Sequence, residues 1–397
     1  MEYMKRNVAI LATCQAVSLT VNLTVIALAG LVGHSLADNK ALATLPVSTF
    51  IIGVAISTIP AAQWMRIVGR SRGFMTGAMV GVFGAIVCSY AVYVVDFWIY
   101  CLGTALLGTQ NAFGQQYRFA AAESSTPEFK AKAISFVLAA GIVGGVLGPE
   151  STKYTKDLFA PYSFLGTYLV VIILCVMVIA LLTQLRIPEL SEEERLEKGR
   201  PLSKIIRQPV FIVTVLGAMV GYAVMNLVMT AGPLAMIACD ISYSSTIFVV
   251  EWHVIGMFAP SFFTGYLINR YGVLQIMITG ALFLFAAVVA AVTGITLYNF
   301  WLALFLLGIG WNFMFIGGTT LLTESYSPAE KAKTQGLNDF MVFGSVALAS
   351  LSSGGLLHVF GWNAVNVGAV PFLLLATGTT FWLLLKRRRE IHSRTAA

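Results

Sequence analysis

Long apolar runs alternate with short polar loops along the whole chain of 397 residues. A transmembrane helix needs about 20 mostly apolar residues, and the chain holds twelve runs of roughly that length. The pattern therefore predicts an all-α membrane protein with twelve transmembrane helices. Their approximate ranges are 7–31, 41–63, 73–94, 97–122, 132–152, 162–184, 209–231, 243–268, 273–296, 299–322, 334–357 and 363–385.

The chain contains an internal repeat at half its length. The stretches 106–138 and 306–339 share a Leu-Leu-Gly start, a long apolar run, an acid, a proline and a Lys-Ala-Lys sequence. The two acids are Glu123 and Glu324. Chance similarity between apolar runs is the alternative, but the shared order of acid, proline and Lys-Ala-Lys favours duplication. In a membrane protein such a repeat is typical of transporters.

The repeat predicts two pseudo-symmetric six-helix bundles. We expect the N-terminal bundle at 1–185 and the C-terminal bundle, with a basic cytoplasmic tail, at 208–397. The stretch 186–207 is the only long charged one, and it separates the two copies of the repeat. It is therefore predicted to be a solvated, partly helical linker in the cytoplasm.

The composition favours lipid as the surroundings of this chain. Charged residues make up 11% of it and hydrophobic residues 58%, and its mean hydropathy is +0.82. A soluble domain carries about 25% charged residues. The net charge of +7 does not indicate nucleic-acid binding, because the basic residues lie in short loops between apolar runs.

The distribution of basic residues predicts the orientation. With both termini in the cytoplasm, only Lys40, Lys153 and Lys156 fall on the outside, and Arg118 lies within a helix. The remaining 21 of the 25 lysines and arginines fall on the inside. Since cytoplasmic loops are rich in Lys and Arg, we expect a multi-pass protein of a bacterial inner membrane.

The sequence holds no motif for catalysis or cofactor binding: HExxH, the Walker loop and GxSxG are absent, and the four histidines are scattered. The five cysteines are odd in number, and four lie inside apolar runs. We therefore interpret the cysteines as small packing residues and not as disulfide partners or metal ligands. We therefore expect no enzyme, no cofactor and no metal site. The sequence also lacks a ring of acidic residues of the kind that marks an ion channel, so we do not expect a channel.

Two loops carry the same short motif. Residues 62–70 read AQWMRIVGR and residues 265–272 read GYLINRYG. Both resemble the Gly-x-Leu-x-Asp-Arg-x-Gly-Arg signature of the major facilitator superfamily of secondary transporters, with Arg66 and Asn269 in place of its aspartate. The resemblance implies that Arg70 and Arg270 bond helix-end carbonyls or a nearby acid. The residues assigned to gating in this way are Gly69, Arg70, Gly265, Arg270, Gly272, Glu123 and Glu324.

The fifth predicted helix is rich in glycine. Gly141, Gly144, Gly145, Gly148 and Pro149 resemble the glycine-proline signature of proton-coupled antiporters in the same superfamily. Small residues four apart let a neighbouring helix approach closely, and a proline permits a bend. Simple tight packing explains the pattern equally well. We assign Gly148 and Pro149 a structural or gating role.

A polar stripe follows one face of the fourth predicted helix. Asn111, Gln115 and Arg118 lie at positions i, i+4 and i+7, which share a helical face. A charged side chain inside the membrane usually faces a cavity or a partner, so Arg118 is a candidate clamp for an anionic group on the solute. The alternative is that Arg118 extends to the cytoplasmic surface.

Three titratable residues are candidates for proton coupling. Glu251 and His253 lie in the eighth predicted helix, and Glu150 lies toward the outer end of the fifth. Either a partly buried carboxyl or an imidazole can take up and release a proton near neutral pH. A structural ion pair is the alternative for Glu251. Asp339 is predicted to stabilise the start of the eleventh helix, where an acid complements the helix dipole.

Further polar and aromatic residues point to the site for a solute. By resemblance, the first, fourth, seventh and tenth helices of this fold line a central cavity. Hydrogen-bonding and aromatic side chains there suit an organic solute with aromatic character, and ordinary packing is the alternative for each aromatic residue. The candidates on the first, seventh and tenth helices are Gln15, Asn22, Tyr222, Asn226, Trp311, Asn312 and Phe315.

Together these features predict a monomeric secondary transporter that moves a small organic solute by alternating access, coupled to protons. The glycine-rich fifth helix favours efflux. Uptake of a vitamin, siderophore or other anionic nutrient is the alternative, supported by Arg118. A membrane sensor or scaffold that does not transport is a third possibility.

Overall fold

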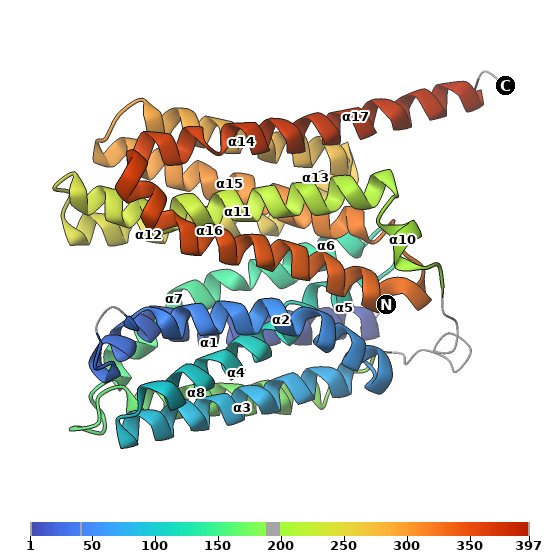
Figure 1. The fold of residues 1–397 in the computed structure, drawn as a ribbon. Helices are drawn as coiled ribbons and strands as arrows, with labels where there is room; N and C mark the ends of the chain where they lie inside the picture. Colours follow the sequence, from blue (N-terminus) through green and yellow to red (C-terminus); the bar gives the residue numbers. More distant parts are fainter. Residues whose placement is uncertain (1, 40–41, 188–198, 396–397) are drawn as a thin grey trace. The chain divides into compact units, whose positions relative to one another are not determined.

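The computed structural model of the chain describes residues 2–39, 42–187 and 199–395, and half of the predicted linker, 188–198, lies outside these ranges. The chain divides into two compact units (Figure 1). Unit 1 comprises Met1–Ser125, Ala140–Lys198 and Pro328–Ala347. Unit 2 comprises Thr126–Ala139, Gly199–Ser327 and Leu348–Ala397. Each unit thus takes most of one sequence half and a short segment of the other.

The described part of unit 1 is helical apart from its loops. Its elements are α1 (Glu2–Leu36), α2 (Leu45–Val68), α3 (Arg70–Val94), α4 (Phe97–Gly114), α5 (Tyr117–Glu123), α7 (Gly141–Thr155), α8 (Leu165–Leu182), the 3-10 turn η2 (Pro328–Glu330) and the first part of α16 (Lys331–Val367). Helix α4 packs against both α2 and α3, and α3 packs against α8. The segment from the other sequence half therefore joins a bundle built around α4.

Unit 2 has the same all-helical character over its described residues. Its elements are α6 (Lys130–Ala139), α10 (Leu202–Ile205), α11 (Pro209–Ala238), α12 (Tyr243–Phe258), α13 (Ser261–Tyr271), α14 (Val273–Val292), α15 (Leu297–Leu322), the second part of α16 and α17 (Val370–Thr395). Helix α15 packs against α11, α12 and α14. The tenth predicted helix is therefore the centre of unit 2, as the fourth is of unit 1.

Close helix contacts depend on small residues, since lipid tails leave van der Waals packing as the main force between membrane helices. A Cβ atom on Gly108 of α4 would lie 2.0 Å from the carbonyl oxygen of Phe50 on α2. A Cβ atom on Gly53 of α2 would lie 2.3 Å from the carbonyl oxygen of Ala105. Glycine at both positions lets the two backbones touch.

Ten helices of the described chain are long and apolar enough to cross a membrane. The fourth predicted segment is not among them, and the last two form one stretch, Pro328–Glu390. The predicted loop between these two, 358–362, contains a break: α16 consists of two helices that meet at Gly361, whose φ of 77° and ψ of 175° are open to glycine, and the second of them continues to Val367.

Two more predicted helices are interrupted. The fifth divides into α6 and α7 at Ala140, and the eighth divides into α12 and α13 at Ala259 and Pro260. Proline has no N–H group and clashes with the preceding turn, so it ends or bends a helix. Each of these predicted helices was drawn as continuous because the hydropathy of the sequence does not change across the break.

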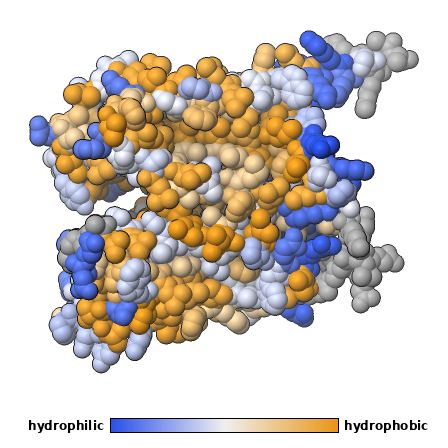
Figure 2. Space-filling model, viewed as in Figure 1, coloured by the Kyte–Doolittle hydropathy of each residue, from blue (hydrophilic) through white to orange (hydrophobic). Residues whose placement is uncertain are grey.

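The surface has the distribution that a lipid-embedded protein needs. Figure 2 shows hydrophobic residues along the lengths of the helices and hydrophilic residues gathered at helix ends, including the end of α17. Large exposed side chains such as Ile173, Phe262 and Leu374 are more than half exposed. In water such a surface would promote aggregation, whereas lipid tails solvate it.

The contact between α6 and α13 can be tested through Gly265. A Cβ atom there would lie 2.7 Å from the Ala131 carbonyl oxygen and the Lys132 Cα atom. We expect Gly265→Ala to destabilise the protein by about 1–3 kcal/mol, because α6 must move away. Thermal unfolding of the detergent-purified protein measures the effect. Gly378→Ala in α17, which has open space around it, is the control, and equal melting temperatures for the two variants would contradict the contact.

Candidate functional site

The turn between α2 and α3 places Arg70 inside unit 1. Gly69 has φ 86° and ψ 162°, a conformation that L residues rarely adopt. Helix α3 begins at the next residue, so the Arg70 side chain points back into the bundle and is only 8% exposed. The glycine of the motif thus makes the turn, and the arginine supplies the charge.

Arg70 forms a two-pronged ion pair with Glu123 at the end of α5. Its Nη2 atom lies 2.6 Å from Oε1 and its Nε atom donates to Oε2 at 3.2 Å. Lys331 Nζ of α16 lies 3.1 Å from Oε2, and Gln335 Nε2 donates to Oε1 at 3.1 Å. The expected pairing of Arg70 with Glu123 is therefore present.

Glu123 stays ionised at neutral pH. Its burial raises the pKa of the carboxyl group, but the adjacent charges of Arg70 and Lys331 outweigh this and lower the pKa to about 2. The pair of Arg70 and Glu123 therefore keeps its charges throughout the pH range in which proteins normally work.

Gln116 connects this pair to a second, deeper one. Its Oε1 atom accepts a hydrogen bond from Arg70 Nη1 at 3.1 Å, and its Nε2 atom donates to Asp339 Oδ2 at 2.7 Å. Asp339 Oδ1 lies 2.5 Å from Arg118 Nη2, and the two side chains are 0% and 2% exposed. We call Arg70, Glu123, Gln116, Arg118 and Asp339 the charged cluster.

The polar stripe on the fourth predicted helix is adjacent to this cluster. Arg118 Nη1 donates to the Gln115 carbonyl oxygen at 2.9 Å and to Gln115 Oε1 at 3.0 Å. Gln115 Nε2 in turn donates to Asn111 Oδ1 at 2.9 Å. The three residues therefore lie together, as their spacing predicts. Because Asp339 neutralises Arg118, a role for Arg118 as a solute clamp requires this pair to open and stays a prediction.

The prediction that Asp339 stabilises the start of a helix through the helix dipole is wrong. Helix α16 begins at Lys331, so Asp339 lies in its third turn, beyond the reach of the helix dipole. Its carboxylate accepts hydrogen bonds from Arg118, Gln116 and Asn338 instead. Asn338 adjoins Asp339 in the sequence, but nothing in the sequence links Asp339 to Arg118 or Gln116, which lie 221 and 223 residues away.

Four aromatic residues of unit 2 form the second feature, which we call the aromatic cluster. The rings of Trp311 and Phe315 on α15 are stacked, with centroids 5.2 Å apart and planes at 14°. The Tyr222 ring of α11 lies edge-on to both, at 5.2 Å from each. Phe258, which the sequence reading missed, lies edge-on to Trp311 at 5.8 Å. Asn226 lies one turn beyond Tyr222 on α11.

Asn312 belongs to the helix break and not to a solute surface. It is fully buried, and its Nδ2 atom donates to the Met257 carbonyl oxygen at 2.6 Å and to Ser261 Oγ at 2.5 Å. Its Oδ1 atom accepts from Thr264 Oγ1 at 2.8 Å. The amide therefore satisfies the Met257 carbonyl beside the helix break at Pro260, which corrects the expectation that it faces a solute.

The polar residues of α1 lie inside unit 1. Gln15 is 6% exposed and Asn22 is 4% exposed. The buried Oδ1 atom of Asn22 has no hydrogen-bond partner within the described part of the chain. Since buried polar atoms are usually paired, Asn22 is the stronger candidate of the two for contact with a solute or water.

The three proton-coupling candidates differ in their surroundings. Glu150 forms an ion pair with Lys153 in an exposed part of α7. His253 is buried, with Nδ1 2.7 Å from the Leu304 carbonyl oxygen. Glu251 is exposed, on the face of α12 opposite Val249 and His253, which are buried. Among the described residues no partner is found for its carboxylate, and a role of Glu251 in proton coupling stays a prediction.

The second copy of the loop motif is arranged differently from the first. Gly272 makes the turn with φ 97°, and Gly265 lies against α6. The Arg270 guanidinium lies 5.3 Å from the Tyr271 ring. Glu324 pairs with Arg387 of α17 at 2.6 Å, not with Arg270. The first copy alone therefore joins a buried charged cluster.

Helix α7 contains the glycine-rich stretch of the fifth predicted helix. A Cβ atom on Gly144 would lie 2.6 Å from Leu19 Cβ, and one on Gly148 would lie 3.0 Å from Leu23 Cβ. Both leucines belong to α1. The contacts are those of two closely packed helices, which favours the packing interpretation of these glycines. The side chain of Pro149 lies outside the described residues.

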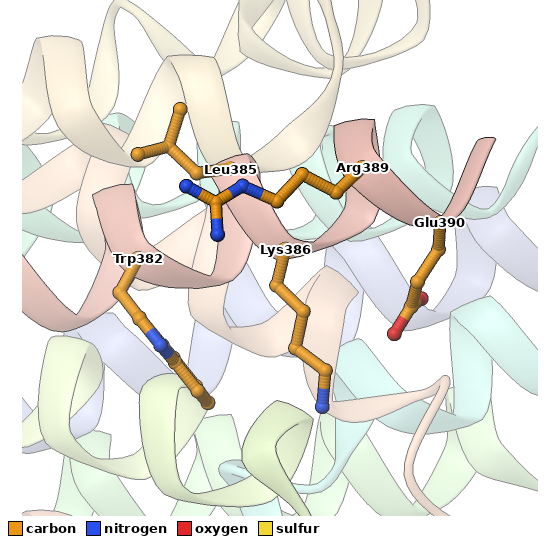
Figure 3. Close-up of a pocket in the computed structure, with 5 residues that line it drawn as sticks. All are labelled: Trp382, Leu385, Lys386, Arg389 and Glu390. Atoms are coloured by element: carbon orange, nitrogen blue, oxygen red, sulfur yellow. The ribbon is translucent and has the colours of Figure 1, made fainter. Parts of the chain in front are cut away.

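A surface pocket at the end of α17 is unsuited to a solute. Figure 3 shows its lining residues, Trp382, Leu385, Lys386, Arg389 and Glu390, all on this one helix. Lys386 Nζ lies 5.6 Å from the centre of the Trp382 ring. A basic and aromatic helix end is typical of an anchor at the membrane surface.

Helices apolar enough to cross a membrane define a multi-pass membrane protein. The chain belongs to the major facilitator superfamily, whose family model matches residues 8–250 and 214–397. It is a secondary transporter and not an enzyme. The expected fold class and family are therefore confirmed.

Individual relatives and solved structures agree with this assignment. The chain is 41% identical over 373 residues to the riboflavin transporter RfnT of Brucella anthropi, covering 94% of both chains. It resembles the transporter FucP in its outward conformation with a TM-score of 0.76 at 16% identity, covering 94% of this chain and 98% of FucP. It resembles the proton:xylose symporter XylE with a TM-score of 0.77 at 13% identity, covering 96% and 95%. The last two likenesses concern the fold alone.

Substitutions can measure how far the contribution of Arg118 to stability depends on Asp339, and the reverse. We expect Arg118→Met or Asp339→Leu to cost about 3–5 kcal/mol each, because each leaves a buried charge without its partner. The double variant should lose much less than the two losses added together. Thermal unfolding in detergent tests this, with the exposed pair of Glu324 and Arg387 as control: Arg387→Met should cost at most about 1 kcal/mol. Simply additive losses would show that the two residues act independently.

Proposed function

We propose that this transporter carries riboflavin, or a flavin with the same ring system, into the cell. The observation that supports this most is the 41% identity to a riboflavin transporter along 94% of both chains. Identity at this level, with no long unmatched segment, is compatible with a shared class of solute. The vitamin alternative to efflux is therefore the better supported of the two.

The chemistry of the solute agrees with the aromatic cluster. Riboflavin has a flat, neutral three-ring system and an uncharged polyhydroxyl chain. Aromatic side chains such as the stacked Trp311 and Phe315 bind flat rings through area and ring geometry. A neutral solute needs no charged clamp, which fits the neutralisation of Arg118 by Asp339.

The efflux interpretation rested on the glycines of the fifth predicted helix. Gly144 and Gly148 lie against Leu19 and Leu23 of α1, and close packing of two helices is required in either direction of transport. The glycines therefore do not favour export, and the nutrient class of the relative's solute favours uptake.

Uptake can be tested in a bacterial strain that cannot synthesise riboflavin. Expression of the chain should restore growth at a riboflavin concentration too low for the empty-vector strain, and labelled riboflavin should accumulate in the cells. An excess of unlabelled riboflavin should prevent this accumulation, while an unrelated vitamin should not. Faster loss of riboflavin from preloaded cells, without restored growth, would instead support efflux.

Concentrative uptake of a neutral solute needs a driving ion, and we propose the proton. Glu251 supports this, because a charged group in a membrane-spanning helix costs about 2.5–3.5 kcal/mol on insertion scales and is usually functional. Its carboxylate is exposed and without a partner among the described residues, so protonation would remove that cost at the moment of transport.

Replacement of Glu251 by Gln tests this role. In proteoliposomes, we expect riboflavin accumulation driven by an imposed pH gradient to fall to the level without a gradient. Exchange of internal for external riboflavin should continue, because exchange needs no net proton movement. Asp157→Asn is the matched control, since Asp157 is an exposed acid in a loop after α7. Unchanged gradient-driven uptake by Glu251→Gln would exclude Glu251 as the proton carrier.

A further inference from the structure

The aromatic cluster contains a buried hydrogen-bond donor without an acceptor. Trp311 is 2% exposed, and its indole Nε1–H has no hydrogen-bond partner within the described ranges. Native proteins pair more than about 90% of buried polar groups, because an unpaired one costs about 1–3 kcal/mol. The other contacts of this ring are to Tyr222, Phe315 and Phe258, through their aromatic faces and edges. The cluster is therefore incomplete in the absence of a ligand.

A second unpaired polar atom lies at the same level of unit 2. The Oδ1 atom of Asn226 is buried and has no hydrogen-bond partner among the residues that the structure describes. Asn226 follows Tyr222 by one helical turn, so both point from the same face of α11. Since Tyr222 contacts Trp311 and Phe315, the face that carries Asn226 is the one turned toward α15.

The register of the two helices brings Asn226 to the level of Trp311. Gly318 of α15 contacts Ala218 of α11, and Gly232 contacts Leu304. The two helices therefore run antiparallel. Because Ala218 is level with Gly318, and Gly232 is level with Leu304, the residues halfway along these two stretches are also level with each other. These midpoints are Met225 and Trp311. Asn226 is thus within one residue of the level of Trp311.

We propose that Asn226 and Trp311 form a subsite for the imide edge of the flavin ring, an inference that rests on the proposed function. This edge presents two carbonyl oxygens with an N–H group between them. Asn226 offers an acceptor for the N3–H group and an amide donor for one carbonyl. The Trp311 indole N–H donates to the other carbonyl. The two unpaired atoms thus match the donor and acceptor order of the ligand.

Stacking and edge recognition act together in this subsite. The Tyr222 ring is half-buried and lies edge-on to the stacked pair of Trp311 and Phe315. Rotation of this side chain opens the stacked pair, and side-chain rotations are fast relative to transport. The ring system of the flavin takes the place of the Tyr222 ring, and its imide edge then faces Asn226. The aromatic residues supply affinity, and the two polar groups supply selectivity.

Comparison of riboflavin with N3-methylriboflavin tests the subsite in the unaltered protein. The methyl group removes the N3–H donor and leaves ring area and charge unchanged. Binding to the full chain in detergent is followed by the quenching of flavin fluorescence. We expect riboflavin to bind at least about tenfold more tightly, because the methylated ring leaves the Asn226 acceptor unpaired. Equal affinity for the two compounds would overturn the proposal.

Variants show which residues cause the preference for riboflavin over N3-methylriboflavin. Asn226→Leu, of similar size, should bind both compounds equally, with riboflavin affinity reduced about tenfold. Trp311→Phe keeps a ring and removes the N–H group, and should weaken riboflavin binding by about tenfold as well. Trp301→Phe is the matched control, because Trp301 of the same helix also has an unpaired indole N–H but lies in a different ring group, with Trp252 and Phe305. It should leave binding unchanged.

The outcomes separate this inference from the proposed function. Riboflavin binding and uptake without selectivity against N3-methylriboflavin would overturn the subsite and leave the proposed function intact. Absence of riboflavin binding to the unaltered protein would overturn both. Selectivity that survives in Asn226→Leu would exclude Asn226, and equal weakening by Trp311→Phe and Trp301→Phe would exclude a specific role for Trp311. Thermal unfolding of each variant shows whether it is folded. If a variant does not fold, the comparison of riboflavin with N3-methylriboflavin in the unaltered protein decides the proposal.

Discussion

The ion pair of Arg118 and Asp339 is the contact on which the arrangement of unit 1 depends. Neither side chain reaches solvent, and a buried charge without a partner costs several kcal/mol, roughly 3–5 by mutational measure. Arg118 belongs to the fourth predicted helix and Asp339 to the eleventh, so the pair ties a segment of the C-terminal sequence half into unit 1. Gln116 then extends the network to Arg70 and Glu123. Removal of the pair would leave α16 without its most specific contact in this unit.

The loop motif of the family is used here in an altered form. Arg66 stands where the family signature has an aspartate, so Arg70 cannot find its acid within the same loop. Glu123 at the end of α5 provides it, and Gln116 and Gln335 accept hydrogen bonds from the same guanidinium. The requirement to pair a buried arginine is thus met by a different element.

The two units carry different chemistry. Unit 1 holds the buried charges, which are paired with one another, and unit 2 holds the aromatic cluster with its unpaired Trp311 and Asn226 atoms. Paired charges are suited to fixing the position of helices, whereas rings beside unpaired neutral polar atoms are suited to a neutral, flat ligand. The sequence alone pointed to Arg118 as the group that contacts the solute. Its pairing with Asp339 shifts that role toward neutral residues.

Much of this molecule follows from one-dimensional patterns. Apolar runs of membrane-spanning length, the position of basic residues and the repeat of Glu123 and Glu324 were enough for the membrane class, the helical fold and the family, because lipid forces every backbone polar group into helices. The pairing of Arg70 with Glu123 was also within reach, since the motif and the repeat named both residues. The helix break at Pro260 was not, because hydropathy is the same on both sides.

Partners of buried polar groups were decided only by the tertiary structure. Asn312 and Asn226 look alike in sequence, each a single amide in an apolar helix, yet Asn312 is bonded to Met257, Ser261 and Thr264 while the Asn226 oxygen has no partner in the described chain. Likewise nothing near Asp339 in the sequence indicates Arg118, 221 residues away. The cost of burying a polar group is set by the atoms a few ångströms from it, and for residues so distant along the chain only the packed helices determine which atoms those are.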